Sequence, residues 1–176
     1  MNATDRYDSL FRYYAEQAGL DEQMFVGGWR LLKAQALQES RLDPNAKSAV
    51  GALGLAQFMQ RTWEEWRDGI PGIQSEPPHD LVLLNPRDPE DAIRSQAAYM
   101  AWLLRQFEGN VRPALAAYNW GIGRVKQAIK IHGDAFLAAA PEETRQYVPR
   151  ILRILGDLIA QDPPVSAASG AGGGHE

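Results

Sequence analysis

Apolar side chains recur at helical spacing along most of this chain, and this periodicity constrains the fold more than any other feature. In the segment 144–159 they stand at Tyr147, Val148, Ile151, Leu152, Leu155 and Ile159. Residues at that spacing share one face of a helix, so the pattern predicts an amphipathic helix. Related patterns predict helices over 7–18, 29–40, 55–66, 91–107, 112–119 and 122–131. We therefore expect an all-α fold.

Glycine and proline separate the predicted helices. Gly19 is placed to end the first helix, and Pro149 predicts a kink or a later start in the last one. The glycines expected in backbone turns are Gly51, Gly54, Gly121 and Gly123. Prolines at positions 71, 77, 78, 86 and 89 predict an irregular, exposed stretch over 67–91, and the role of 67–84 stays open.

The composition is typical of one globular unit without covalent cross-links. With 176 residues, 45% of them hydrophobic, the chain can bury one core, so we expect a single domain over 1–162 that opens with a helix within 1–19. Residues 163–176 are rich in proline, serine and glycine and are expected to form a flexible tail. The absence of cysteine excludes disulfides, thiolate metal sites and a cysteine nucleophile.

Charge and hydropathy exclude several classes of partner. A net charge of -4 gives no general attraction to nucleic acid or anionic lipid, although it leaves room for a local basic patch. We find no nucleic-acid motif and no apolar stretch long enough to span a membrane. His79, His132 and His175 lie far apart in the sequence, so we expect neither a metal site nor a cofactor. A monomer is expected.

Glu39 is the residue most indicative of chemistry. It shares one helical stripe with Trp29, Leu32 and Ala36, so its side chain points toward the buried side of its helix. A glutamate at a helix end is usually a solvated surface residue, and the stripe argues against that interpretation. Burial disfavours the carboxylate anion and raises its pKa, which suits a group that must donate a proton near neutral pH.

Four sequence blocks in a fixed order carry a family resemblance. The first is Gln38-Glu39-Ser40, continued by Asn45-Ala46-Lys47-Ser48 and by the segment 51–59, GALGLAQFM. The others are NPRDPEDAI at 85–93, ALAAYNWG at 114–121 and ETRQYV at 143–148. Over roughly residues 20–155 this order resembles the soluble lytic transglycosylases of family 1, the SLT domain, which are similar to goose-type lysozymes.

The resemblance implies a helical, lysozyme-like fold with a substrate groove. Members of the family cleave the β-1,4 bond between N-acetylmuramic acid and N-acetylglucosamine in peptidoglycan glycan strands, and they form 1,6-anhydromuramyl products without adding water. One carboxylate acts first as acid and then as base, because the muramyl 6-hydroxyl replaces the second carboxylate of most glycosidases. Glu39 matches that carboxylate.

Other motif positions match substrate-binding residues of the family. They are Ser48, Gln57, Met59, Tyr118, Asn119 and Glu143. Ser48 and Gln57 offer a hydroxyl and an amide to N-acetyl and peptide groups, although such side chains also commonly pin loops. Met59 and Tyr118 offer surfaces to the apolar faces of sugars, and the Tyr118 hydroxyl is expected to hydrogen-bond toward Glu39.

Two features leave details of specificity open. Glu143 matches a substrate-binding glutamate near the far end of the groove, but a glutamate there also suits the first turn of a helix. The family usually has methionine where this chain has Ala56 and proline where it has Gln60. Trp63, Trp66 and Trp120 are left unassigned.

Two other functions are compatible with the pattern. The first is a muramidase of the same fold, in which Asp43, Asp88 or Asp91 holds an attacking water. The second is a structural protein that grips peptidoglycan after losing activity, although the retained Glu39 argues against that loss.

The first residues of the sequence carry an expectation about delivery. They are polar and acidic, without the apolar segment of an ordinary cleavable secretion signal. We therefore expect synthesis in the cytoplasm and action on the cell wall in the periplasm, reached through a phage holin, a virion or a secretion apparatus. A phage or prophage origin is favoured.

Overall fold

The described part of the chain is built from helices. The computed structural model describes residues 5–20, 27–59 and 85–161. Its helices are α1 (Asp8–Gln17), α2 (Trp29–Ser40), α4 (Pro89–Gln106), α5 (Val111–Trp120), α6 (Ile122–His132) and α7 (Glu142–Gln161), with a 3-10 helix, η3 (Gly133–Ala139), before α7. The predicted all-α fold is confirmed. Within these ranges no helix is long and apolar enough to cross a membrane.

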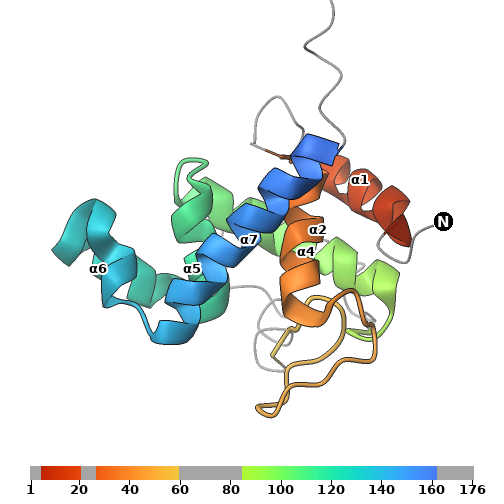
Figure 1. The fold of residues 1–176 in the computed structure, drawn as a ribbon, viewed down its shortest axis with the longest axis horizontal. Coiled ribbons are helices and arrows are strands. Elements are labelled where there is room, and N and C mark those ends of the chain that lie inside the picture. Colours follow the sequence, from red (N-terminus) through yellow and green to blue (C-terminus); the bar gives the residue numbers. More distant parts are fainter. Residues whose placement is uncertain (1–4, 21–26, 60–84, 162–176) are drawn as a thin grey trace, which may run out of the picture.

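Helix α2 occupies the centre of the fold and is covered on several sides. It packs against α1, α4 and α7, and Figure 1 shows α7 passing across α2 toward α5, with α6 at the far end. Its buried residues are Trp29, Arg30, Leu31, Leu32, Lys33, Ala34, Gln35 and Ala36. Buried polar groups need partners, and Lys33 forms an ion pair with Asp8 of α1 at 2.6 Å. The start of α2 is thereby tied to α1.

The first two predicted helices agree closely with the structure. Helix α1 stops just before Gly19, whose φ of +73° is the left-handed conformation that glycine adopts without strain. Helix α2 ends where Arg41 and Leu42 take positive φ angles of 57° and 64°. The chain therefore changes direction directly at the end of α2, just after Glu39.

Helix α4 begins two residues earlier than predicted. The Asp88 carboxylate accepts hydrogen bonds from the backbone N–H groups of Glu90 and Asp91, both at 3.0 Å. Pro89 then occupies the first turn, where its missing N–H is not needed. The irregular stretch expected up to 91 ends at Asp88 for this reason.

The C-terminal half also follows the predicted pattern, with two corrections. Helix α7 starts at Glu142 and continues through Pro149, so a later start is wrong. Tyr147, Val148 and Ile151 are buried around the proline, and this packing offsets the lost backbone hydrogen bond. Gly121 turns the chain between α5 and α6 with a φ of +96°, whereas Gly123 lies inside α6.

The helix predicted over 55–66 is wrong for its described part. Residues 54–57 form a turn, and the Leu53 N–H donates to the Phe58 carbonyl at 3.0 Å in an isolated bridge. Gln57 adopts a positive φ of 50°, which a helix excludes. The expectations for 60–84, with Trp63, Trp66 and His79, and for the tail 163–176, with His175, fall outside the described residues.

Candidate active site

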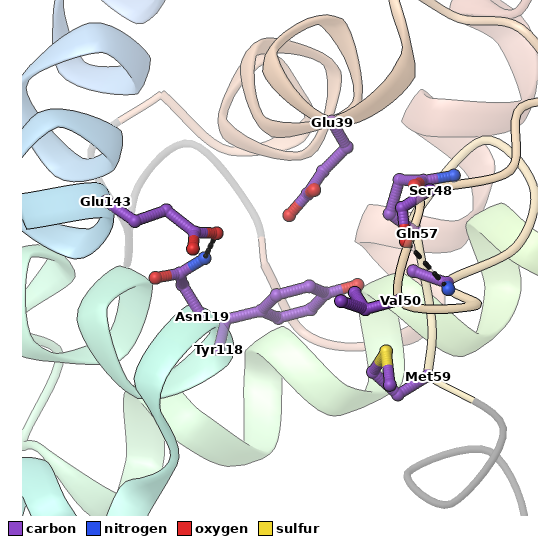
Figure 2. A pocket seen from close by; sticks show the side chains of 9 residues that line it. Glu39, Ser48, Val50, Gln57, Met59, Tyr118, Asn119 and Glu143 are labelled. Atoms are coloured by element: carbon purple, nitrogen blue, oxygen red, sulfur yellow. Dashed lines mark hydrogen bonds between the residues drawn. The ribbon is translucent and has the colours of Figure 1, made fainter. Parts of the chain in front are cut away.

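A cavity of about 310 Å³ opens beside the last turn of α2. Its lining residues are Glu39, Ser48, Val50, Ala52, Gln57, Met59, Tyr118, Asn119 and Glu143. Figure 2 shows the labelled side chains facing a common space, with Glu39 reaching in from α2 and Glu143 from α7. The structure brings every site residue predicted from the sequence to this cavity, and it adds Val50 and Ala52.

The electrostatics of the cavity centre on Glu39. This side chain is half-buried, and burial raises its pKa from an ordinary 4.5 to about 7. A hydrogen bond from the Tyr147 hydroxyl to Glu39 Oε1, at 2.5 Å, acts in the opposite direction, and the negative charge of Glu143 raises the pKa further. Near neutral pH the carboxyl is thus able both to give and to accept a proton.

A buried chain of hydrogen bonds leads to Glu39 from the core. Gln96 Nε2 of α4 donates to Gln35 Oε1 of α2 at 2.9 Å, and Gln35 Nε2 donates to the Tyr147 hydroxyl at 3.1 Å. Tyr147 then donates to Glu39, so every donor points toward the carboxylate. Gln35 and Gln96 are fully buried, and burial raises the pKa of Tyr147 well above its usual range. The chain holds a neutral donor against one oxygen of Glu39.

Sequence reasoning missed Tyr147 as a site residue. Its helical spacing with Ile151 marked it as core, and it is indeed 5% exposed. One available signal was Gln35, an amide in the middle of an otherwise buried helix, because a buried amide requires hydrogen-bond partners from neighbouring elements. That signal points to a polar contact but does not name the partner.

The hydrogen bond expected from Tyr118 to Glu39 is wrong. The Tyr118 hydroxyl donates instead to the Ala56 carbonyl at 3.0 Å, so it ties α5 to the loop after α2. Its ring contacts those of Phe58 and Tyr99, with centroids 5.7 and 5.3 Å away. Tyr118 therefore forms a rigid part of the cavity wall.

Ser48 and Gln57 both pin the loop and line the cavity. Ser48 Oγ accepts from the Ala52 N–H at 2.9 Å, while Gln57 Nε2 donates to the Gly54 carbonyl at 2.8 Å. These bonds leave the Ser48 hydroxyl hydrogen and the Gln57 carbonyl oxygen for other partners. A role in holding the loop is therefore compatible with a role in binding substrate.

The same loop is held close to α2 and to the turn before α4. Ser40 Oγ donates to the Leu55 carbonyl at 2.8 Å. Gly54 has a φ of +72°, and a Cβ atom there would lie 1.7 Å from the Pro86 carbonyl oxygen. Only glycine fits this position, because both the backbone conformation and the contact exclude a side chain.

Asn119 joins the end of α5 to α7. Its Nδ2 donates to Glu143 Oε1 at 3.1 Å, and Thr144 Oγ1 donates to its Oδ1 at 2.6 Å. Glu143 is exposed and faces Glu39 across the cavity in Figure 2. Asn119 thus orients a second carboxylate toward the open space.

The aspartates considered for a hydrolytic mechanism are engaged elsewhere. Asp88 caps α4, Asp91 Oδ2 accepts from the Asn85 N–H at 2.9 Å, and Asp43 Oδ1 accepts from the Asn45 N–H at 2.9 Å. Among the described residues, the carboxylates that line the cavity are those of Glu39 and Glu143.

The open space continues from Glu39 along α7. A second cavity of about 290 Å³ shares Glu39, Ser48, Gln57, Asn119 and Glu143 with the first and adds Gln38, Gln146, Tyr147 and Arg150. We call these two adjoining cavities, which share Glu39 among their lining residues, the groove. Trp120, unassigned from the sequence, is half-buried and packs against the core.

Comparison with known sequences identifies the family. The model of the transglycosylase SLT domain matches residues 16–136. The peptidoglycan transglycosylase gp16 of Escherichia phage T7 is 32% identical over 160 residues, which are 90% of this chain and 11% of that protein. The soluble lytic murein transglycosylase of Escherichia coli K12 is 34% identical over 154 residues, 83% of this chain and 22% of its own.

Solved structures show the same fold. One is the lytic transglycosylase Slt of Pseudomonas aeruginosa, solved as an inactive glutamate-to-glutamine variant. The match covers 89% of this chain and 24% of the Slt chain, with a TM-score of 0.68 and 29% sequence identity. The 70-kDa soluble lytic transglycosylase in complex with bulgecin A matches 91% and 25% with a TM-score of 0.72 and 30% identity. This chain spans no more than about a quarter of these relatives. It belongs to the transglycosylase SLT domain family and has the helical, lysozyme-like fold of its solved members.

Proposed function

We propose that this chain is a peptidoglycan lytic transglycosylase that cleaves the β-1,4 bond between N-acetylmuramic acid and N-acetylglucosamine. The observation that carries the proposal is Glu39, a half-buried carboxyl with a pKa of about 7 that lines the groove together with the family's motif residues. Names of relatives support it, since they describe peptidoglycan and murein transglycosylases.

The reaction needs one group that alternates between acid and base. Protonated Glu39 donates its proton to the glycosidic oxygen while the bond from that oxygen to muramyl C1 breaks. The Glu39 carboxylate then takes the proton of the muramyl 6-hydroxyl, whose oxygen bonds to C1 and closes the 1,6-anhydro ring. Glu39 ends protonated and no water is consumed, so a pKa near the working pH serves both steps.

Neighbouring residues would hold the Glu39 carboxyl and the sugar in fixed positions relative to each other. Tyr147 holds Oε1 of Glu39, which leaves Oε2 as the atom that exchanges protons with the substrate. Ser48 and Gln57 present polar atoms to N-acetyl groups, and Asn119 and Glu143 present them from the opposite side. Met59, 41% exposed, and the ring of Tyr118 offer apolar surface to the sugar faces.

The hydrolytic alternative is less well supported. It requires a second carboxylate that holds an attacking water, and Asp43, Asp88 and Asp91 are absent from the cavity lining. Among the residues that the structure describes, Glu143 is the remaining acidic residue there, and its carboxylate is bonded to Asn119. A Glu143→Gln variant therefore separates the two mechanisms, because hydrolysis depends on this second carboxylate and ring closure does not.

Mass spectrometry of the muropeptides released from purified peptidoglycan tests the proposal. The parent should release products lighter by one water and without a reducible end. Glu39→Gln should release them about a thousandfold more slowly, because general acid and base catalysis are both removed. Glu143→Gln should retain the anhydro product. Reducible products would establish the muramidase, and no release by the folded parent would support a binding protein.

The partner and place of action follow from this activity. We propose peptidoglycan glycan strands as the substrate of a monomer that acts at the cell wall as part of a phage lysis or entry system. The likeness to a phage T7 protein supports that setting. Detection of the chain in purified particles of the encoding phage would support delivery by the virion, and its absence from them would argue for release during lysis.

A further inference from the structure

The outer face of α7 carries a cationic hollow that the proposed reaction does not use. It has a volume of about 420 Å³ and is lined by Arg145, Gln146, Pro149, Arg150 and Arg153. No carboxylate is among these lining residues, although the whole chain has a net charge of -4. The hollow is a local positive region on an acidic protein, and such a region attracts anionic groups.

This hollow adjoins the groove that contains Glu39. Gln146 and Arg150 line both the hollow and the 290 Å³ cavity next to Glu39. Arg150 Nη2 donates to Gln146 Oε1 at 2.7 Å, and Gln146 lies one turn closer to the start of α7. The bond therefore directs the guanidinium back along the helix, toward the end that carries Glu143 and Tyr147.

Most of the hydrogen-bonding capacity of Arg150 remains open. A guanidinium has five N–H donors, and the bond to Gln146 uses one of them. Arg150 and Arg153 are exposed, and neither forms an ion pair within the described ranges. A planar guanidinium fork is the side chain best suited to hold a carboxylate through two parallel hydrogen bonds.

Resting on the proposed function, we propose that Arg150, supported by the charge of Arg153, binds a carboxylate of the peptide stem of peptidoglycan. The unmodified sugars of the glycan strand are neutral, whereas the peptides attached to muramic acid carry free carboxylates. A strand bound across Glu39 projects its stems away from the groove, and Arg150 lies where the groove meets open solvent along α7. The arginine thus makes cleavage sensitive to the charge of the stem.

The test compares soluble glycan fragments whose stem carboxylates are either free or converted to methylamides. For the parent, kcat/KM should fall about tenfold on conversion, mostly through KM, because a charge-assisted pair is lost. Arg150→Gln should lose the same factor on the free-carboxylate fragment and less than about twofold on the methylamide. On the free-carboxylate fragment, the kcat/KM of Arg150→Lys should lie between those of the parent and Arg150→Gln, since lysine keeps the charge but lacks the guanidinium fork.

A matched control and a binding measurement separate this inference from the proposed function. Arg112, exposed in the first turn of α5, lies outside both cavities, so Arg112→Gln should leave both values of kcat/KM unchanged. Calorimetry with Glu39→Gln measures the Kd of each fragment without turnover, and the methylamide fragment should have the larger Kd. In the double variant Glu39→Gln/Arg150→Gln the ratio of the two Kd values should fall to about one. If Arg150→Gln lowered binding equally for both fragments, the stem carboxylate would be excluded as its partner, whatever products the parent forms.

Discussion

The cavity around Glu39 has two walls that are held in place by different forces. The helical wall consists of Glu39, Tyr118, Asn119 and Glu143, at the ends of α2, α5 and α7, whose other turns are buried in the core. The loop wall consists of Ser48, Val50, Ala52, Gln57 and Met59, and its fixed points are backbone hydrogen bonds and residues with positive φ.

This difference indicates a division of labour. The helical wall contains Glu39, the proposed acid and base, and burial by packed helices raises its pKa. The loop wall shapes the space opposite, and its large apolar residues Val50 and Met59 are exposed. Changes in the helical wall should therefore alter the pH dependence, whereas changes in the loop wall should alter stability and substrate fit.

The largest expected effect concerns the loop wall. Gly54→Ala places a Cβ 1.7 Å from the Pro86 carbonyl oxygen in a residue with a φ of +72°, so the two backbones must separate. We expect a loss of more than about 3 kcal/mol in the free energy of unfolding, measured in urea. Gly51→Ala is the matched control, since Gly51 also has a positive φ but no neighbouring atom within 4 Å, and it should cost about 1 kcal/mol. Equal losses would show that the contact with Pro86 is unimportant.

The next effect tests the helical wall through stability. The Glu39 pKa is raised from 4.5 to about 7 on folding, so the folded state binds more protons in this window and the parent loses stability as the pH rises through it. Glu39→Gln removes the buried anion. It should match the parent at pH 4 and exceed it by about 3 kcal/mol at pH 8 in urea unfolding. A stability difference that does not change with pH would contradict the raised pKa.

The hydrogen bond from Tyr147 should have a smaller effect on activity. This bond lowers the Glu39 pKa, so Tyr147→Phe should raise it and move the alkaline limb of the pH–rate profile to higher pH, with about a tenfold lower kcat. Gln35→Leu should shift the limb in the same direction by less, because it acts through Tyr147.

Tyr118→Phe is the control for this comparison. Its hydroxyl bonds to the Ala56 carbonyl and not to Glu39, so the alkaline limb should stay in place. If Tyr118→Phe moved the alkaline limb as far as Tyr147→Phe, the conclusion that Tyr147 and not Tyr118 holds the Glu39 carboxyl would be wrong.

The smallest expected effect is that of Ser48→Ala. It removes the acceptor of the Ala52 N–H and should cost about 1 kcal/mol in urea unfolding. The alkaline limb should not move, because Ser48 belongs to the loop wall. A fall in kcat/KM measured where the variant is fully folded would indicate that the hydroxyl also contacts the substrate.

Success in predicting the fold was greatest where local signals agreed. The bounds of α2 follow from its periodicity, and α6 from Gly121 and the pattern after it. The prediction failed over 55–59, where Leu55, Ala56 and Phe58 are buried as a helical pattern would suggest. The segment is shaped instead by a bridge between Leu53 and Phe58 and by the close approach of Gly54 to Pro86, which short-range periodicity does not register.

For the site, the sequence by itself determined the residue types and their order: Glu39 on a buried stripe, and motif positions that converge on one cavity. Only the tertiary structure decided that Tyr147 and not Tyr118 holds Glu39, and that Arg150 borders the same groove. Periodicity reports which face of a helix is buried. It does not report which residue of a helix 108 positions away lies opposite, because that depends on how α2 and α7 cross in the packed core.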